Sequence, residues 1–109
     1  MNVKWVLKGI VLKCMPEKVR KHLLKVYYLR ALKSYLKNRL WESYENDMAI
    51  VKGIVTRGDS VIDIGANFGV YSALLSKLTG EDGEVFSFEP IPLTYEILLN
   101  NVQKLSLVN

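Results

Sequence analysis

Cysteine and histidine are almost absent from the sequence, and this limits its chemistry. Cys14 is the single cysteine among 109 residues, so no internal disulfide can form, which is typical of a reducing compartment. His22 is the single histidine and lies in a lysine-rich stretch, so a histidine-based metal cluster is excluded. We therefore expect a cytoplasmic protein and predict no metal site.

Long apolar runs are also lacking. The sequence contains no uninterrupted apolar stretch of about 20 residues, so we expect no transmembrane segment. The N-terminal WVLKGIVLK is broken by Lys8 and is followed by no small-residue cleavage site, which argues against a secretory signal. Apolar residues still make up 50% of the sequence, too many for a disordered tail.

Acidic residues are scarce in the first third of the chain. Residues 1–39 contain eleven Lys and Arg against one acid, Glu17, a net charge of about +10. Residues 40–109 contain four Lys and Arg against ten acids, a net charge of about −6. We therefore divide the chain into a basic helical region, residues 1–41, and a second unit, residues 42–109.

The basic region contains one long predicted helix. Pro16 and Glu17 are typical of a helix start, and the helical pattern continues to about Leu40. Apolar and aromatic residues at three- and four-residue spacing share one face: Leu24, Tyr27, Tyr28, Ala31, Leu32 and Tyr35. Most cations are expected opposite that face: Lys25, Arg30, Lys33 and Lys37. Such a basic face is most often solvated. Contact of residues 17–40 with an anionic membrane is the alternative, and no specific nucleic acid is expected.

Short β-branched runs alternate with helical spacing in the rest of the chain. A short helix at Glu45–Ile54 and a turn at Arg57–Asp59 are predicted first. Then follow a buried strand at about 60–64, a helix at about 69–79, a second strand at about 84–89 and a helix at about 92–105. The crossovers are long enough for parallel strands. We therefore predict an α/β fold, an incomplete Rossmann-like βαβα unit preceded by basic helices.

The most informative segment joins the first strand to the helix after it. Its sequence is VIDIGANFGVYS, residues 61–72, with the pattern D-x-G-x-N-x-G. Glycines at such a turn let a ligand approach the backbone and the N–H groups of a helix start. A dinucleotide G-x-G-x-x-G beginning at Gly65 would need glycines where the chain has Asn67 and Val70, and no Gly-Lys-Ser/Thr of a P-loop follows.

Two acids near this turn suit a cationic nucleoside ligand such as S-adenosylmethionine (SAM). SAM carries an ammonium and a sulfonium, and it lacks a pyrophosphate. Asp63 can favour its cationic methionine end, while N–H groups of residues 65–69 can meet its carboxylate. Glu89 follows Gly69 by twenty residues, the offset at which an acid accepts hydrogen bonds from ribose hydroxyls in such folds.

VIDIGANFGVYS, followed by VFSFEPIPLTYEILLNNV, closely resembles the SAM-binding front of FkbM-type methyltransferases. In that family the loop has the pattern D-I-G-A-N-x-G, and the second strand ends in F-E-P. The resemblance covers residues 42–109, with residues 60–103 as its specific part. It implies SAM as cofactor and, for most of the family, methyl transfer to a hydroxyl of a sugar or natural product, hence a small-molecule or glycan acceptor. It also implies these cofactor positions: Asp63, Gly65, Ala66, Asn67, Gly69, Tyr71, Ser72 and Glu89.

Two parallel strands do not make a stable sheet by themselves, and residues 105–109 resemble the approach to a third. We therefore expect an incomplete methyltransferase domain that is inactive alone, and we assign no catalytic residue. Two alternatives stay open. One is another Rossmann-type module that binds NAD or a nucleotide, and the other is a non-enzymatic remnant whose basic helix binds an anionic membrane or RNA.

Overall fold

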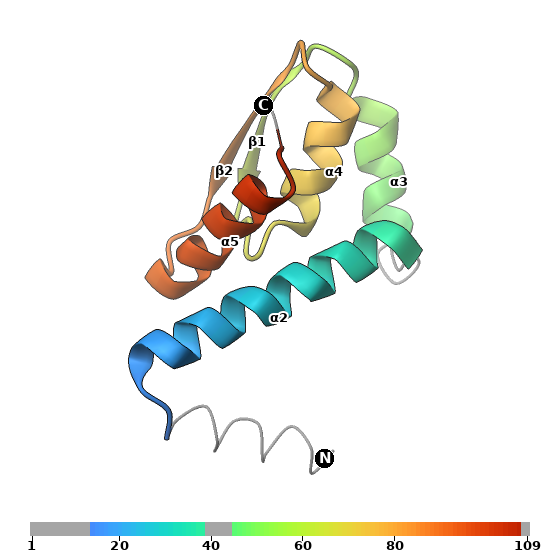
Figure 1. Ribbon diagram of the computed structural model, residues 1–109. Coiled ribbons are helices and arrows are strands. Elements are labelled where there is room, and N and C mark those ends of the chain that lie inside the picture. The colour runs from blue at the N-terminus through green and yellow to red at the C-terminus, as the bar shows by residue number, and fades with distance from the viewer. Residues whose placement is uncertain (1–13, 39–44, 108–109) are drawn as a thin grey trace.

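The computed structural model describes residues 14–38 and 45–107, which form helices around a small sheet (Figure 1). The elements follow in the order α2 (Glu17–Asn38), α3 (Glu45–Ile54), β1 (Ser60–Ile64), α4 (Val70–Thr79), β2 (Glu84–Phe88) and α5 (Pro92–Lys104). β1 and β2 pair in parallel, with Ser60 beside Glu84 and Ile64 beside Phe88. The predicted α/β class and the order strand, helix, strand, helix are confirmed, and the arrangement is compatible with an incomplete Rossmann-like unit.

The predicted bounds agree with the observed ones to within a residue over residues 45–107. β2 ends at Phe88, so Glu89 lies in the following loop, and α5 ends at Lys104. The predicted helix end near Leu40 and the division after residue 41 lie outside the described residues, so both stay predictions. None of the helices in the described ranges is long and apolar enough to span a membrane.

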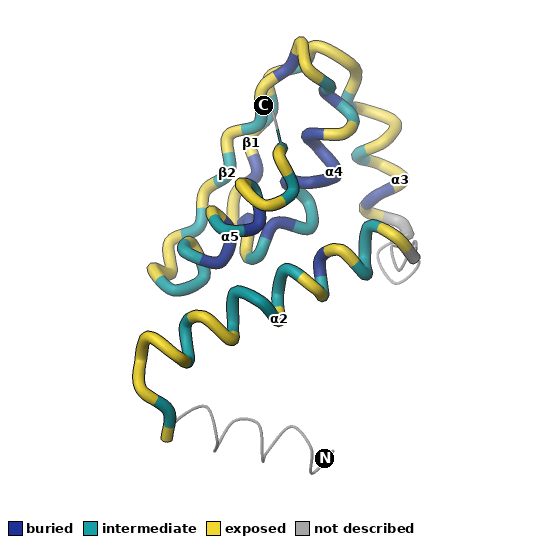
Figure 2. Tube along the Cα trace, in the orientation of Figure 1, coloured by how far each residue is buried: buried dark blue, intermediate teal, exposed yellow. Residues whose placement is uncertain are grey.

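The core lies between one face of the sheet and helices α4 and α5 (Figure 2). Leu74 and Leu75 of α4 are buried, as are Ile97 and Leu98 of α5. Side chains of α4, β2 and α5 together line a cavity of about 180 Å³, with Ser87 among them. Both helices therefore cover the same face of the sheet.

The opposite face of the sheet is exposed, so the prediction of a buried strand at 60–64 is wrong on this face. Ile62 and Ile64 of β1 are 64% and 85% exposed, and their partners Phe86 and Phe88 are 48% and 56% exposed. A β-branched run indicates that a strand can be buried on both faces, but it does not indicate what covers it. Here helices α4 and α5 both lie on the other face of the sheet.

Helix α2 lies across the carboxyl ends of the strands and packs against α5 (Figure 1). The centre of its predicted apolar face is confirmed, because Leu32 is fully buried and two aromatic rings of the helix pack on Phe68. Tyr27 lies at the border of this face. It is 42% exposed, and its ring meets that of Tyr28 edge-on at a centroid distance of 5.2 Å.

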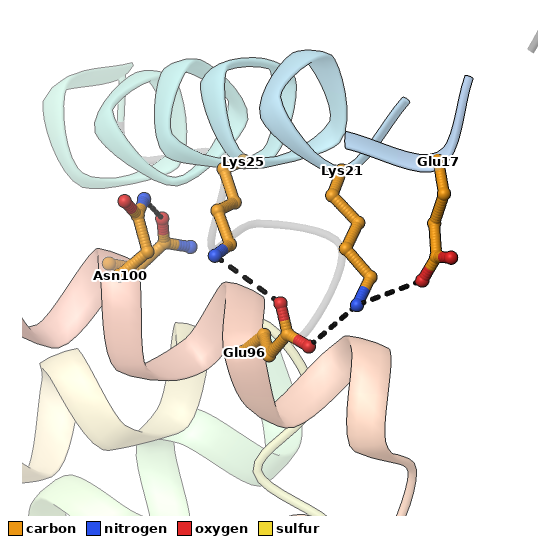
Figure 3. A network of polar contacts seen from close by, with 6 residues as sticks. Glu17, Lys21, Lys25, Glu96 and Asn100 are labelled. Atoms are coloured by element: carbon orange, nitrogen blue, oxygen red, sulfur yellow. Dashed lines mark hydrogen bonds and ion pairs between the residues drawn. The ribbon is translucent and has the colours of Figure 1, made fainter. Parts of the chain in front are cut away.

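The prediction that Lys25 lies opposite the apolar face is wrong, because an acid on another helix attracts it. Lys25 Nζ lies 3.4 Å from Oε2 of Glu96 on α5, and Lys21 Nζ lies 3.0 Å from Oε1 (Figure 3). Lys21 Nζ is also 3.1 Å from Oε1 of Glu17. The hydrogen bond from Lys21, together with Lys25, lowers the pKa of Glu96, and the hydrogen bond to Glu96 raises the pKa of Lys21. The spacing of residues within α2 could not have predicted the contact of Lys25 with Glu96, because Glu96 belongs to another helix.

Candidate functional site

The glycine loop, residues 65–69, closes the carboxyl end of β1 and leads into α4. Its backbone has positive φ at Gly65 (79°), Asn67 (52°) and Gly69 (102°). Glycine adopts this left-handed region without strain, and asparagine tolerates it better than most residues. Gly69 also lies close to α5, because an added β-carbon would be 3.0 Å from Leu98 Cδ1. The pattern G-x-N-x-G is therefore what the backbone of this loop requires.

Hydrogen bonds to the end of β2 hold the glycine loop in place. The N–H groups of Gly65 and Ala66 both donate to the Phe88 carbonyl, at 2.9 and 3.0 Å, and the Gly69 N–H donates to the Ala66 carbonyl at 2.9 Å. The Ala66 side chain is buried at 4% exposure, so a ligand would meet its backbone. Because these N–H groups are used within the protein, a ligand carboxylate would instead meet the first turn of α4. The N-cap of this helix is Gly69, so no side chain caps the N–H groups of the first turn.

The Glu89 carboxylate joins the two loops at the carboxyl ends of the strands. Its Oε2 accepts the Asn67 N–H at 3.0 Å, and its Oε1 accepts the Ile91 N–H at 2.9 Å. Each carboxylate oxygen has a second lone pair, so the group can still accept hydroxyl hydrogen bonds. Sequence spacing predicted Glu89 as a ligand contact. The structure adds that Glu89 stabilises the left-handed turn at Asn67.

Asp63 turns toward α4 and forms a buried polar cluster with two serines. The Ser72 hydroxyl donates to Asp63 Oδ2 at 2.7 Å, and the Ser72 and Ser87 hydroxyl oxygens lie 2.8 Å apart. Asp63 and Ser72 are 9% and 2% exposed. Sequence reasoning missed Ser87. Ser87 could have been found only from the strand register, in which it is the direct partner of Asp63. A single sequence does not give that register.

Four of the eight predicted site residues line three cavities. Asp63 and Tyr71 line a cavity of about 390 Å³ between β1, α3 and α4. Ser72 lines the cavity of about 180 Å³, and Asn67 lines one of about 120 Å³ between α2, the glycine loop and α5. Ligand pockets commonly measure about 300–1,000 Å³, so of these three only the cavity beside β1 is large enough. The structure thus pairs Asp63 with Ser72 and Asn67 with Glu89, and Glu89 is not part of the large cavity's lining.

Phe68, the fourth residue of the glycine loop, contacts two helices. Its ring packs on Tyr28 and Tyr35 of α2, at centroid distances of 5.1 and 6.3 Å. Its carbonyl accepts a hydrogen bond of 2.8 Å from Nδ2 of Asn101, a fully buried residue of α5. Tyr28 and Tyr35, which the sequence placed on the apolar face of this helix, therefore act as packing residues. Asn101 was missed, because an Asn in a polar-looking Asn-Asn pair gives no sign of burial.

An Asn101→Ala variant is expected to lose about 1–3 kcal/mol of unfolding free energy, since it removes a buried hydrogen bond and leaves space behind. Urea denaturation followed by circular dichroism measures this loss. The matched control is Gln103→Ala, which removes an exposed amide from the same helix and is expected to change stability by no more than about 0.5 kcal/mol. Equal losses in the two variants would contradict a positioning role for Asn101.

Metal ligands do not cluster in the described residues, where no group of three or more His, Cys, Asp or Glu could hold an ion. The charged and polar groups of the site are instead two carboxylates, two serine hydroxyls and backbone N–H groups around a glycine loop. This set has both acceptors for hydroxyls and negative charge for a cationic ligand.

About half of this chain is similar in sequence to a known methyltransferase. Protein-L-isoaspartate O-methyltransferase from Methanococcoides burtonii is 32% identical over 50 residues, which are 46% of this chain and 25% of that protein. The matched segment is about a quarter of the length of the relative. No protein family model matches, and no solved structure matches. The similarity supports a relationship to SAM-dependent methyltransferases in general, and no comparison shows the FkbM family.

Proposed function

We propose that this chain forms the cofactor-binding part of a SAM-dependent methyltransferase of FkbM type. The observation that carries the proposal is the Glu89 carboxylate bound to the N–H of Asn67, which brings the acid after β2 against the glycine loop after β1. The parallel strand–helix–strand unit and the similarity to a methyltransferase support it. The NAD alternative is less well supported, because Asn67 and Val70 stand where a dinucleotide loop has glycine.

Each polar group of the site has a separate task in this proposal. Glu89 accepts the ribose hydroxyls with its remaining lone pairs while it keeps the loop in shape. Asp63, held by Ser72, places negative charge near the cationic methionine end, and the first turn of α4 meets the methionine carboxylate. Gly65 keeps the loop backbone bare so that the cofactor can lie against it, because an added β-carbon there meets no protein atom within 4 Å.

SAM supplies a methyl group on a sulfonium. Bound SAM would supply this methyl group to an acceptor hydroxyl, whose proton would pass to a base. The name of the relative states O-methylation, which supports oxygen as the acceptor atom here. A sugar or natural product as the acceptor is what the resemblance of residues 60–103 to the FkbM family implies. We assign no described residue as the base. The exposed apolar face of the sheet supports our expectation that the 109-residue chain alone transfers no methyl group, and the single cysteine supports a cytoplasmic location.

A Glu89→Ala variant is expected to weaken SAM binding by about 1–3 kcal/mol, a fivefold to 150-fold rise in Kd, because it removes hydrogen bonds to a charged acceptor. Calorimetric titration measures this in a protein whose sheet is completed by further strands. The matched control is Glu84→Ala, on an exposed acid at the opposite end of β2, which is expected to leave Kd unchanged. Unchanged affinity in the Glu89 variant, or tight NAD binding in place of SAM, would overturn the proposal.

A further inference from the structure

Apart from Glu17 at its start, the exposed residues of α2 gather on one side of the helix (Figure 2). Between residues 18 and 37 they are Lys18, Val19, His22, Leu23, Tyr27, Arg30, Lys33 and Lys37. Successive members are one, three or four residues apart, which is the spacing of a single helix face. We name these eight residues the outer face of α2. The side of α2 opposite to it packs against α5 and the glycine loop.

The outer face carries positive charge without compensation. Four of its residues are lysine or arginine, and none is acidic. None of the four takes part in an ion pair among the residues that the structure describes. Glu17, the one acid of α2, and Glu96 of α5 both bind inward-turned lysines, Lys21 and Lys25. The packing of α2 thus uses the acids on one side and leaves a cationic surface on the other.

A stripe of large apolar side chains runs through these cations. Val19, Leu23 and Tyr27 follow one another at four-residue intervals and are 47%, 41% and 42% exposed. A solvated basic helix has no need of such a stripe. A helix that lies in the surface of a membrane needs both features, because its apolar side chains enter the acyl boundary and its cations meet lipid phosphates. Lysine stems can lie along the apolar layer while their ammonium groups reach the headgroups.

We propose that the outer face of α2 binds the surface of an anionic phospholipid membrane. Charge complementarity selects anionic lipid, and the stripe of Val19, Leu23 and Tyr27 selects a bilayer over a purely ionic partner. RNA fits this face less well, since two of the three stripe residues are aliphatic and cannot stack on bases. The proposal is independent of the methyltransferase assignment, because none of the predicted cofactor residues belongs to the outer face.

Vesicle sedimentation tests the charge requirement. The full chain is mixed with phosphatidylcholine vesicles that either contain or lack phosphatidylserine, and binding is expected only to the anionic vesicles. The triple variant Lys18→Gln, Lys33→Gln, Lys37→Gln is expected to bind them roughly a hundredfold more weakly, about fivefold per lysine. The matched control neutralises the exposed lysines of three other helices: Lys52→Gln, Lys77→Gln and Lys104→Gln. It has the same net charge and is expected to bind nearly as well as the parent.

A Leu23→Ser variant tests the apolar requirement without any change of charge. It is expected to bind anionic vesicles about threefold to tenfold more weakly, because half-exposed leucine surface no longer enters the bilayer. Circular dichroism confirms that all variants keep the helix content of the parent. The proposal is overturned if the parent does not bind anionic vesicles or if both triple variants lose binding equally. It is also overturned if Leu23→Ser binds vesicles like the parent while a single-stranded RNA oligonucleotide binds the outer face more tightly.

Discussion

A Gly65→Val variant of a protein with a completed sheet is expected to bind SAM roughly a hundredfold more weakly, a loss of about 3 kcal/mol. Gly65 has φ of 79°, where a β-branched residue is strained. A β-carbon added there meets no atom within 4 Å, so the new side chain would project into the open space beside the loop. In the proposed site that space belongs to the cofactor. Calorimetric titration with SAM measures the loss.

The control for this experiment is Gly58→Val, which separates strain from obstruction. Gly58 has φ of 89° and also has no atom within 4 Å of an added β-carbon. It lies in the turn before β1, at the other end of the strand from the glycine loop. Both valine variants are therefore expected to lose similar unfolding free energy, while SAM affinity falls in Gly65→Val alone. Retained affinity in both variants would remove Gly65 from the cofactor site.

Gly83→Ala is expected to destabilise the fold by about 3 kcal/mol, the largest stability effect we foresee. An added β-carbon would lie 2.5 Å from Cβ of Thr79 and 2.6 Å from the carbonyl oxygen of Asp59. Thr79 is fully buried, and the Asp59 carbonyl accepts the Glu84 N–H at 3.0 Å, where the strands begin to pair. Neither neighbour can move without a change of the backbone. Urea denaturation measures the loss.

Gly53→Ala is the matched control and is expected to have the opposite sign. Gly53 lies within α3 and has no atom within 4 Å of an added β-carbon. Alanine is the better helix former, so the variant is expected to gain about 0.5–1 kcal/mol of stability. A Gly83→Ala protein as stable as the parent would show that the turn before β2 can rearrange freely.

Local patterns predicted the elements of residues 45–107 well, because their signals lie within a few residues of each other. The short β-branched runs at 60–64 and 84–88 and the glycine and proline residues between them were enough to predict both strands and the helices after them. The parallel pairing followed from the length of the crossovers. The glycine loop was predicted for a related reason, since its left-handed backbone positions require particular residues at fixed spacing.

Contacts between elements could not be predicted from one sequence. Lys25 was expected to face solvent and instead lies 3.4 Å from Glu96, a residue of a different helix. Asp63 was expected to favour the cationic end of a ligand, and its carboxylate accepts the Ser72 hydroxyl in a cluster that includes Ser87. In each case the contact joins two separate elements. Such contacts depend on packing angle and strand register, which local patterns do not contain.

The aromatic contact between α2 and the glycine loop makes the order of the loop depend on the helix. If α2 detaches, Phe68 loses the rings of Tyr28 and Tyr35. A ligand that binds only the ordered loop therefore also stabilises the docked position of α2 relative to the detached one. The size of this free energy depends on the concentration of the ligand and on its affinity for the loop. The dependence is reciprocal, so anything that holds α2 in place strengthens ligand binding by the same factor. In hydrogen exchange, the amides of α2 and of the loop would then gain protection together when either partner binds.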